Sequence, residues 1–86
     1  MGAQPDCYPN CQGANLTGAN LTGADLREVN LSGANLVAAF LGNANLSGAN
    51  LTRANLTRAI LTRAILYRAR FSDTTCPNGT VTNTGC

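Results

Sequence analysis

The sequence predicts an all-β fold in which short coils of chain stack along one axis. Three observations predict it: a strict five-residue period, a large aliphatic residue at the centre of each period with a small residue two places before it, and a shortage of aromatic residues. The stretch GANLTGANLTGADL at residues 13–26 shows the first two directly. Because the chain has only two tyrosines, two phenylalanines and no tryptophan, burial must rest on aliphatic side chains.

The repeat runs without insertion through twelve units over residues 14–73. Two positions before each central residue stands alanine, replaced by Val29 in the fourth unit. The central residues, which we expect to form the core, are Leu16, Leu21, Leu26, Leu31, Leu36, Leu41, Leu46, Leu51, Leu56, Leu61, Leu66 and Phe71.

A period of five does not fit an ordinary helix or a flat strand. Five helical residues advance ~500°, so successive leucines would scatter around the cylinder. Side chains on a strand alternate between faces, so an odd period would send successive leucines to opposite faces. A backbone that turns a corner every five residues brings all of them inside. The chain is therefore expected to wind as a solenoid whose coils stack through backbone hydrogen bonds, ~4.8 Å apart.

The corner of each unit lies two residues after the leucine. Glycine stands there at Gly18, Gly23, Gly33 and Gly48, as expected where a tight turn needs an unusual dihedral angle. Arginine takes the same position four times, so we expect that the corner does not always require a positive φ.

The units ANLTG, ANLTG, ADLRE, VNLSG and ANLVA resemble the A-(D/N)-L-x-x units of the pentapeptide repeat family. The resemblance covers all twelve units. It implies a right-handed quadrilateral parallel β-helix with four units, or twenty residues, in each coil. On that template residues 14–73 form about three coils, residues 1–13 an N-terminal cap and residues 74–86 a C-terminal cap, each cap with a cysteine pair.

Stacking at a spacing of twenty predicts the composition of each face. Asn15, Asn35 and Asn55 fall above one another, where their amides could hydrogen-bond along the stack. The family usually keeps Asn or Asp at this position, bonded to nearby backbone. This chain departs from the pattern at Phe40, Ile60, Ile65 and Arg70.

Phe40 lies below Ile60 in this map, and Ile65 follows around the corner, so the three form an apolar step on a polar tube. One interpretation is a docking patch for a partner or a second copy. The other is that the tail after Phe71 covers these side chains, or that they are tolerated singly on the surface.

Charge is concentrated towards the C-terminus. Residues 1–50 hold one arginine and three acids, a balance of −2, whereas residues 51–86 hold five arginines and one acid, a balance of +4. Corner positions predict an ion pair between Arg53 and Asp73 and an arginine collar made of Arg53, Arg58, Arg63 and Arg68. Such a collar could attract an anionic surface. We favour a solvated end that prevents end-to-end stacking, because flanking aromatic residues are almost absent.

The four cysteines lie outside the twelve units. Three stacked coils separate the chain ends by more than ~10 Å, and disulfide partners need Cα atoms within ~7 Å. We therefore expect the local pairs Cys7–Cys11 and Cys76–Cys86. The same separation argues against a zinc site that would use all four cysteines.

Disulfides favour an oxidising compartment. The cysteine-containing caps of this chain resemble those of exported cyanobacterial members of the family, which implies a location in the periplasm or the thylakoid lumen. The alternative is a cytoplasmic protein with reduced thiols. No apolar run approaches the ~20 residues of a membrane span. The start MGAQPDC lacks the apolar segment of a signal peptide, so any export signal has been removed or never existed.

The residue inventory argues against catalysis, because the chain has no histidine, no lysine and no suitably spaced carboxylate pair. We expect no cofactor, no metal and no small-molecule substrate. The function favoured by elimination is a small rigid scaffold or protein-interaction module with an unidentified protein partner. The alternative is a weak binder of nucleic acid or membrane surfaces through the arginine collar. A gyrase-type DNA mimic, known in the family, is disfavoured because this chain is short and not acidic. The oligomeric state is left open.

Overall fold

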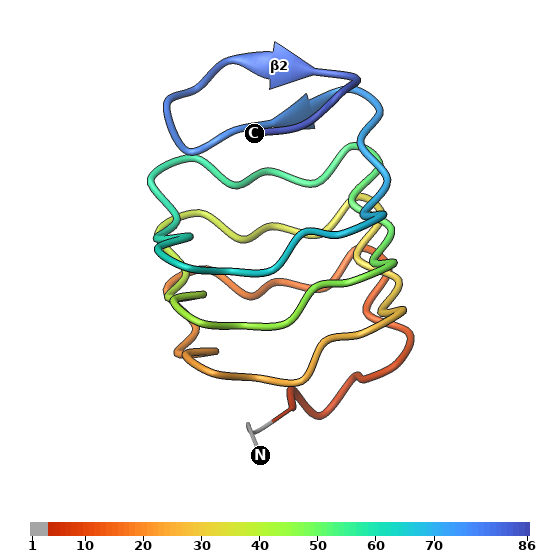
Figure 1. Ribbon diagram of the computed structural model, residues 1–86, viewed down its shortest axis with the longest axis vertical. Helices are drawn as coiled ribbons and strands as arrows, with labels where there is room; N and C mark the ends of the chain where they lie inside the picture. Colours follow the sequence, from red (N-terminus) through yellow and green to blue (C-terminus); the bar gives the residue numbers. More distant parts are fainter. Residues whose placement is uncertain (1–3) are drawn as a thin grey trace.

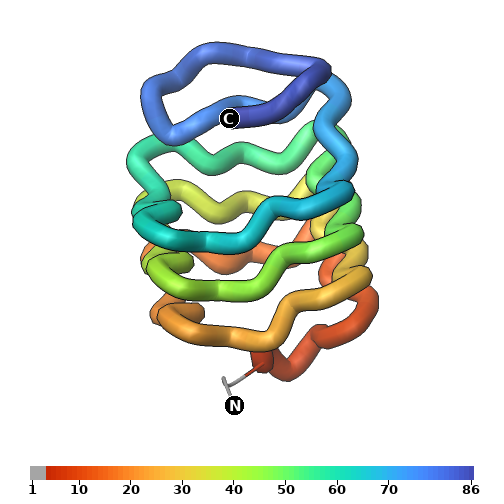
Figure 2. Tube along the Cα trace, in the orientation of Figure 1, coloured from red at the N-terminus to blue at the C-terminus, as the bar shows by residue number. Residues whose placement is uncertain are grey.

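The computed structural model describes residues 4–86 as a stack of coils, with the hairpin of β1 (Thr74–Thr75) and β2 (Val81–Thr82) at the C-terminal end (Figures 1 and 2). Its principal extents are 30 × 23 × 20 Å. Ten parallel bridges join residues twenty apart, beginning with Asn10–Asn30 and ending with Asn55–Thr75. These bridges confirm the predicted spacing of twenty residues per coil.

Formal strands are short within residues 4–86. The strands β1 (Thr74–Thr75) and β2 (Val81–Thr82) pair antiparallel at the C-terminal end. Over the same residues there is no helix long and apolar enough to cross a membrane.

Backbone hydrogen bonds join each five-residue side of the tube to the side one coil below it and to the side one coil above it. The N–H of Leu21 donates to the carbonyl of Phe40 at 2.7 Å, and the N–H of Phe40 donates to the carbonyl of Ala19 at 2.8 Å. The same two bonds recur along the stack, so the backbone groups of a middle coil are satisfied by its neighbours.

The expectation that an arginine corner does not require a positive φ is wrong. Every corner residue of the twelve units has a positive φ, and for the eight that are not glycine φ lies between 50° and 61°. At eleven of the twelve corners, all but the one at Asp73, the N–H of the following alanine or Val29 donates to the leucine carbonyl three residues earlier, as from Ala54 to Leu51 at 3.0 Å. A turn with a positive φ at its third residue favours glycine, and another residue there costs about 1–2 kcal/mol.

A ladder bond compensates for this strain at two of the four arginine corners, Arg53 and Arg58. The N–H of Arg53 donates to the carbonyl of Ser72 at 2.8 Å, and that of Arg58 to the carbonyl of Pro77 at 2.8 Å. The geometry of the coil therefore imposes the corner conformation whatever the side chain.

The aliphatic side chains line the inside of the tube. The leucines from Leu21 to Leu56 are at most 5% exposed, whereas Leu16, Leu61, Leu66 and Phe71, near the two ends, are only partly buried. The alanine column and Val29 pack beside the leucines. The core is therefore continuous through the middle coils and thins towards the ends.

The asparagines act within their own side of the tube. Their Oδ1 atoms accept the N–H two residues on, as from Val37 to Asn35 at 3.1 Å and from Thr57 to Asn55 at 3.1 Å. The expected amide ladder through Asn15, Asn35 and Asn55 is not formed; the Oδ1 atom of each accepts instead from the backbone N–H two residues on. One amide bond does run along the stack, from Asn30 Nδ2 to Asn10 Oδ1 at 3.4 Å.

Two of the four cysteines belong to the column of central residues. Cys11 stands five residues before Leu16, and Cys76 stands five residues after Phe71. They are 1% and 7% exposed. Disulfides join Cys7 to Cys11 and Cys76 to Cys86, with Cα–Cα distances of 5.0 and 5.4 Å. Each disulfide thus connects a cap to the end of the core.

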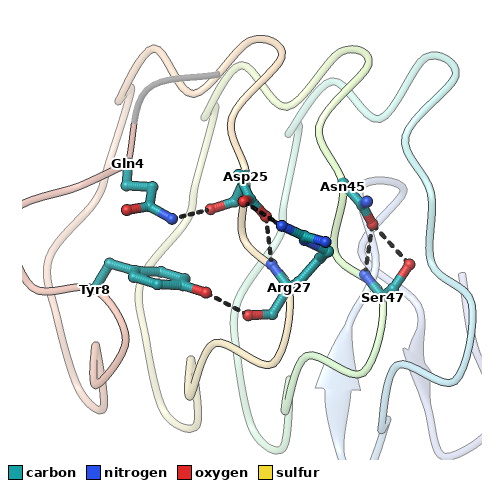
Figure 3. Close-up of polar contacts among 6 residues, drawn as sticks. All are labelled: Gln4, Tyr8, Asp25, Arg27, Asn45 and Ser47. Atoms are coloured by element: carbon teal, nitrogen blue, oxygen red, sulfur yellow. Dashed lines mark hydrogen bonds and ion pairs between the residues drawn. The ribbon is translucent and has the colours of Figure 1, made fainter. Parts of the chain in front are cut away.

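The caps satisfy part of the backbone at each end. At the N-terminal end Gln4 Nε2 donates to the carbonyl of Asp25 at 3.0 Å, and the Tyr8 hydroxyl donates to the carbonyl of Arg27 at 2.6 Å (Figure 3). At the C-terminal end the hydroxyl of the buried Thr74 donates to the carbonyl of Leu51 at 2.6 Å. Each cap covers some sides of the tube and leaves others open.

Candidate interaction surfaces

The apolar step is exposed on the outside of the tube. Phe40 is 45%, Ile60 44% and Ile65 48% exposed, and Phe40 pairs with Ile60 through a parallel bridge. The tail after Phe71 therefore does not cover these side chains. Ile65 pairs with Asn45 on the neighbouring side.

The step stands where other units carry a structural amide. Asn20 accepts the N–H of Thr22 at 3.2 Å, and Asn45 accepts both the N–H and the hydroxyl of Ser47, at 3.1 and 2.6 Å. Figure 3 shows this arrangement at Asn45. Phe40, Ile60 and Ile65 have no side-chain atom that could accept such a bond. These units therefore lose a local hydrogen bond, and nearly half of each apolar residue stays exposed to solvent.

The arginine collar surrounds the C-terminal end, with Arg58, Arg63 and Arg68 at successive corners of one coil and Arg53 at the corner before them. All four residues are exposed. Arg63 Nε donates to Asn43 Oδ1 at 3.0 Å, and the Arg68 guanidinium lies 5.3 Å from the ring centroid of Tyr67. The collar thus places one positive charge at each of four successive corners.

The predicted ion pair between Arg53 and Asp73 is not formed. Within residues 4–86 the only ion pair joins Arg27 to Asp25, Nε to Oδ1 at 2.8 Å. Both Arg53 and Asp73 are exposed, where an ion pair gains little over the hydration of the separate charges.

The Asp25–Arg27 pair was not anticipated from the sequence, although both residues stand on one side of the tube, two positions apart. Arg27 binds the carboxylate with Nε and with Nη2, at 2.8 and 2.9 Å, and its N–H donates to Oδ1 at 3.3 Å (Figure 3). These hydrogen bonds lower the pKa of the Asp25 carboxyl and raise the pKa of Arg27.

A cavity of about 510 Å³ opens at the C-terminal end, between the last coil and its cap. We call it the terminal cavity. The sequence did not predict it, because the tail after Asp73 leaves the five-residue pattern and its path is set by β1, β2 and the Cys76–Cys86 disulfide. Its walls are Ala59, Leu61, Cys76, Pro77, Asn78, Thr80, Val81, Thr82, Gly85 and Cys86.

Metal-binding groups are not gathered anywhere in the part of the chain that the structure describes. Over residues 4–86 no three Cys, Asp or Glu side chains lie close enough to hold an ion. All four cysteines are in disulfides.

The profile of the pentapeptide repeat family matches residues 10–48 and 40–75, in eight copies. The chain belongs to this family. Its matched region begins with the unit centred on Cys11 and ends at the bridge of Thr75. No curated protein matches the sequence.

Solved structures of pentapeptide repeat proteins are similar to this chain. One, from the thylakoid lumen of Arabidopsis thaliana, is 25% identical, with a TM-score of 0.78 over 90% of this chain and 53% of its own. A protein from Nostoc PCC 7120 is 36% identical over 78% of this chain and 60% of its own (TM-score 0.40), and one from Cyanothece 51142 is 36% identical over 84% and 56% (TM-score 0.43). The chain therefore spans between half and three-fifths of the length of these proteins.

Proposed function

We propose that the protein is a small rigid protein-interaction module, built as a right-handed quadrilateral β-helix, whose docking surface is the apolar step. One observation carries the proposal. Three large apolar side chains stand exposed at positions where all the other units but that of Arg70 hold a hydrogen-bonded Asn or Asp. They contribute little to the core and remove local hydrogen bonds, so association is the role that best accounts for them.

The shape of the module supports this proposal. The step extends over two stacked sides and around one corner, with a backbone fixed by bridges to the coil below. A rigid surface loses little conformational entropy on binding. We further propose that the protein acts in an oxidising, exported compartment, supported by its two disulfides and by its likeness to a thylakoid-lumen protein.

The test compares the wild-type protein with the double variant Phe40→Asn/Ile60→Asn. Both changes install the residue that accepts the local hydrogen bond in other units, so the fold is kept while the apolar surface is removed. The matched control is Arg70→Asn, which makes the same change at the same position of a unit without removing an apolar side chain. Each oxidised protein is immobilised and incubated with extract of the source cells at 50 and 300 mM NaCl.

The proposal predicts partners that bind the wild type and Arg70→Asn at both salt concentrations and are lost with the double variant. Partners bound equally by all three proteins would refute the apolar step as the docking surface. Partners that all leave between 50 and 300 mM NaCl would indicate the arginine collar and an anionic ligand instead.

A further inference from the structure

The side formed by residues 59–63 has an open upper edge. One coil below, the side 39–43 is fully paired: the N–H of Leu41 donates to the carbonyl of Ile60 at 2.8 Å, and that of Asn43 to the carbonyl of Thr62 at 2.9 Å. The corresponding groups one coil up are the N–H groups of Leu61 and Arg63 and the carbonyl of Ala59. Among residues 4–86 these three groups have no hydrogen-bond partner.

The terminal cavity lies directly along this edge. Ala59 and Leu61 form one wall, and Val81, Thr82 and the Cys76–Cys86 disulfide belong to the cap on the other. The chain does not enter this space as a further coil, because it turns back after Pro77, whose carbonyl accepts from the Arg58 N–H, and continues as β2, antiparallel to β1. The volume, about 510 Å³, falls within the usual range of ligand sites, roughly 300–1,000 Å³.

The pattern of open groups specifies the kind of ligand. The Ala59 carbonyl and the Leu61 N–H lie on the straight part of this side, and the Arg63 N–H lies in the corner turn that ends it. This is the set that every lower side uses to bind the coil above it, so the complementary ligand is a chain segment that follows the path of one repeat unit. Addition of a strand to an open edge is a general mode of peptide recognition.

The arginines around this side indicate the charge of the ligand. Arg58 and Arg63 stand at the two corners that bound this side, Arg68 stands at the next corner, and all three are exposed. Asp73 is the only acid in residues 51–86, and it lies at a corner of a different side. A strand with acidic residues at its ends would therefore meet an arginine at each end.

We propose that the terminal cavity binds a short acidic peptide of a partner protein, which pairs with residues 59–63 as the next coil of the stack would. The site is separate from the apolar step, since Ile60 is exposed and does not line the cavity. The proposal therefore does not rest on the docking role of Phe40 and Ile60.

The probe is the acetylated, amidated and fluorescently labelled peptide EATLTE, whose spacing copies one repeat unit between two acids. In the proposed pairing the N–H of its first threonine donates to the Ala59 carbonyl, and the carbonyls of its two threonines accept from Leu61 and Arg63. Fluorescence anisotropy should show saturable binding to the oxidised protein. The peptide KATLTK should bind at least tenfold more weakly, and so should EATLTE with an N-methyl group on its first threonine.

Protein variants locate the binding. Val81→Glu puts a like charge into the cavity at a position that is already 60% exposed, and it should weaken EATLTE at least tenfold. The control Thr84→Glu adds the same charge to the same cap outside the cavity wall and should change binding less than twofold. Phe40→Asn should also leave it unchanged, which separates this site from the apolar step.

Amide hydrogen exchange gives the decisive readout. Bound EATLTE should slow exchange of the Leu61 and Arg63 amides at least tenfold, while those of Leu41 and Asn43, already paired, stay unchanged. The proposal is overturned if EATLTE does not bind, or if neither the N-methyl group nor Val81→Glu weakens its binding. It is also overturned if Leu61 and Arg63 are already protected in the free protein and sedimentation shows a dimer, because a second copy would then occupy the edge.

Discussion

Leu36 and Leu66 are both the central residue of a repeat unit, yet their surroundings differ. Leu36 lies in the middle of the tube, is 0% exposed, and donates its N–H to the carbonyl of Asn55 at 2.8 Å. Leu66 lies in the last coil, is only partly buried, and its N–H has no partner among residues 4–86. The difference shows that a unit is stabilised mainly by the coils above and below it, as in other stacked-repeat proteins.

The last coil is weakened by a second feature as well. Ile60, Ile65 and Arg70 all replace the amide that accepts a local hydrogen bond, whereas the middle coil has one such replacement, Phe40. Fewer local bonds and fewer neighbours lower the free energy needed for local opening. The coil that carries most of the candidate binding residues is thus also the one least supported by the stack.

The largest effect should come from truncating the two leucines. Leu36→Ala should lower the free energy of unfolding by about 3 kcal/mol or more, because it leaves a cavity in a closed core. Leu66→Ala should cost about 1 kcal/mol, because solvent already reaches this site. Urea denaturation of both variants measures the difference, and equal losses would contradict the contrast between middle and end.

A smaller effect should separate two glycines of neighbouring coils. Gly33 is a corner residue with φ at 68° and open space where a Cβ would lie, so Gly33→Ala should destabilise by about 1–2 kcal/mol through backbone strain alone. Gly42 has no positive φ, and the atom nearest to an added Cβ, the Thr62 carbonyl oxygen, would be 3.6 Å away. Gly42→Ala should therefore be neutral or stabilise by up to about 1 kcal/mol.

Thermal unfolding of these two variants tests whether the coil imposes the corner conformation. If Gly33→Ala were as stable as Gly42→Ala, the corners would not require a positive φ, and the eight non-glycine corners would need another explanation.

The smallest effect concerns the Asp25–Arg27 pair near the N-terminal cap. Arg27 lowers the folded-state pKa of Asp25, so the pair stabilises the fold fully above the ordinary carboxyl pKa of about 3.9. This contribution is lost as the pH falls through the lowered pKa of Asp25. Arg27→Gln should shift the pKa of Asp25 upward, in the direction of its ordinary value.

An NMR titration of the Asp25 carboxyl carbon measures this shift. Arg53→Gln serves as the control, because Arg53 makes no contact with Asp25 and should leave that titration unchanged. An Asp25 titration that is the same in Arg27→Gln and in the wild type would show that the ion pair is absent in solution.

The sequence predicted the column of buried residues because a period of five allows few backbones. The spacing of twenty followed from the family resemblance, and the bridges confirm it. The corner conformation was missed because arginine by itself disfavours a positive φ. The stack outweighs that preference, since a corner N–H such as that of Arg53 gains a ladder bond at 2.8 Å.

Side-chain partners were harder to predict than backbone partners. The amide ladder and the Arg53–Asp73 pair both assumed that stacked side chains bind one another. Local geometry decides instead: Asn35 accepts a bond from Val37 within its own side, and Asp25 binds Arg27 two residues away. The terminal cavity could not be predicted, because it depends on a cap that does not follow the repeat.

Amide hydrogen exchange of the free, oxidised protein tests the central claim most directly, which is that residues twenty apart are held together by backbone hydrogen bonds between coils. The amides of Leu36, Leu41 and Leu46 donate to carbonyls of the next coil. They should exchange slowly and with similar protection factors. The amides of Leu61 and Leu66 should exchange at least a hundredfold faster. Equal exchange at all five leucines, or rapid exchange at Leu36, would contradict the stacked-coil account.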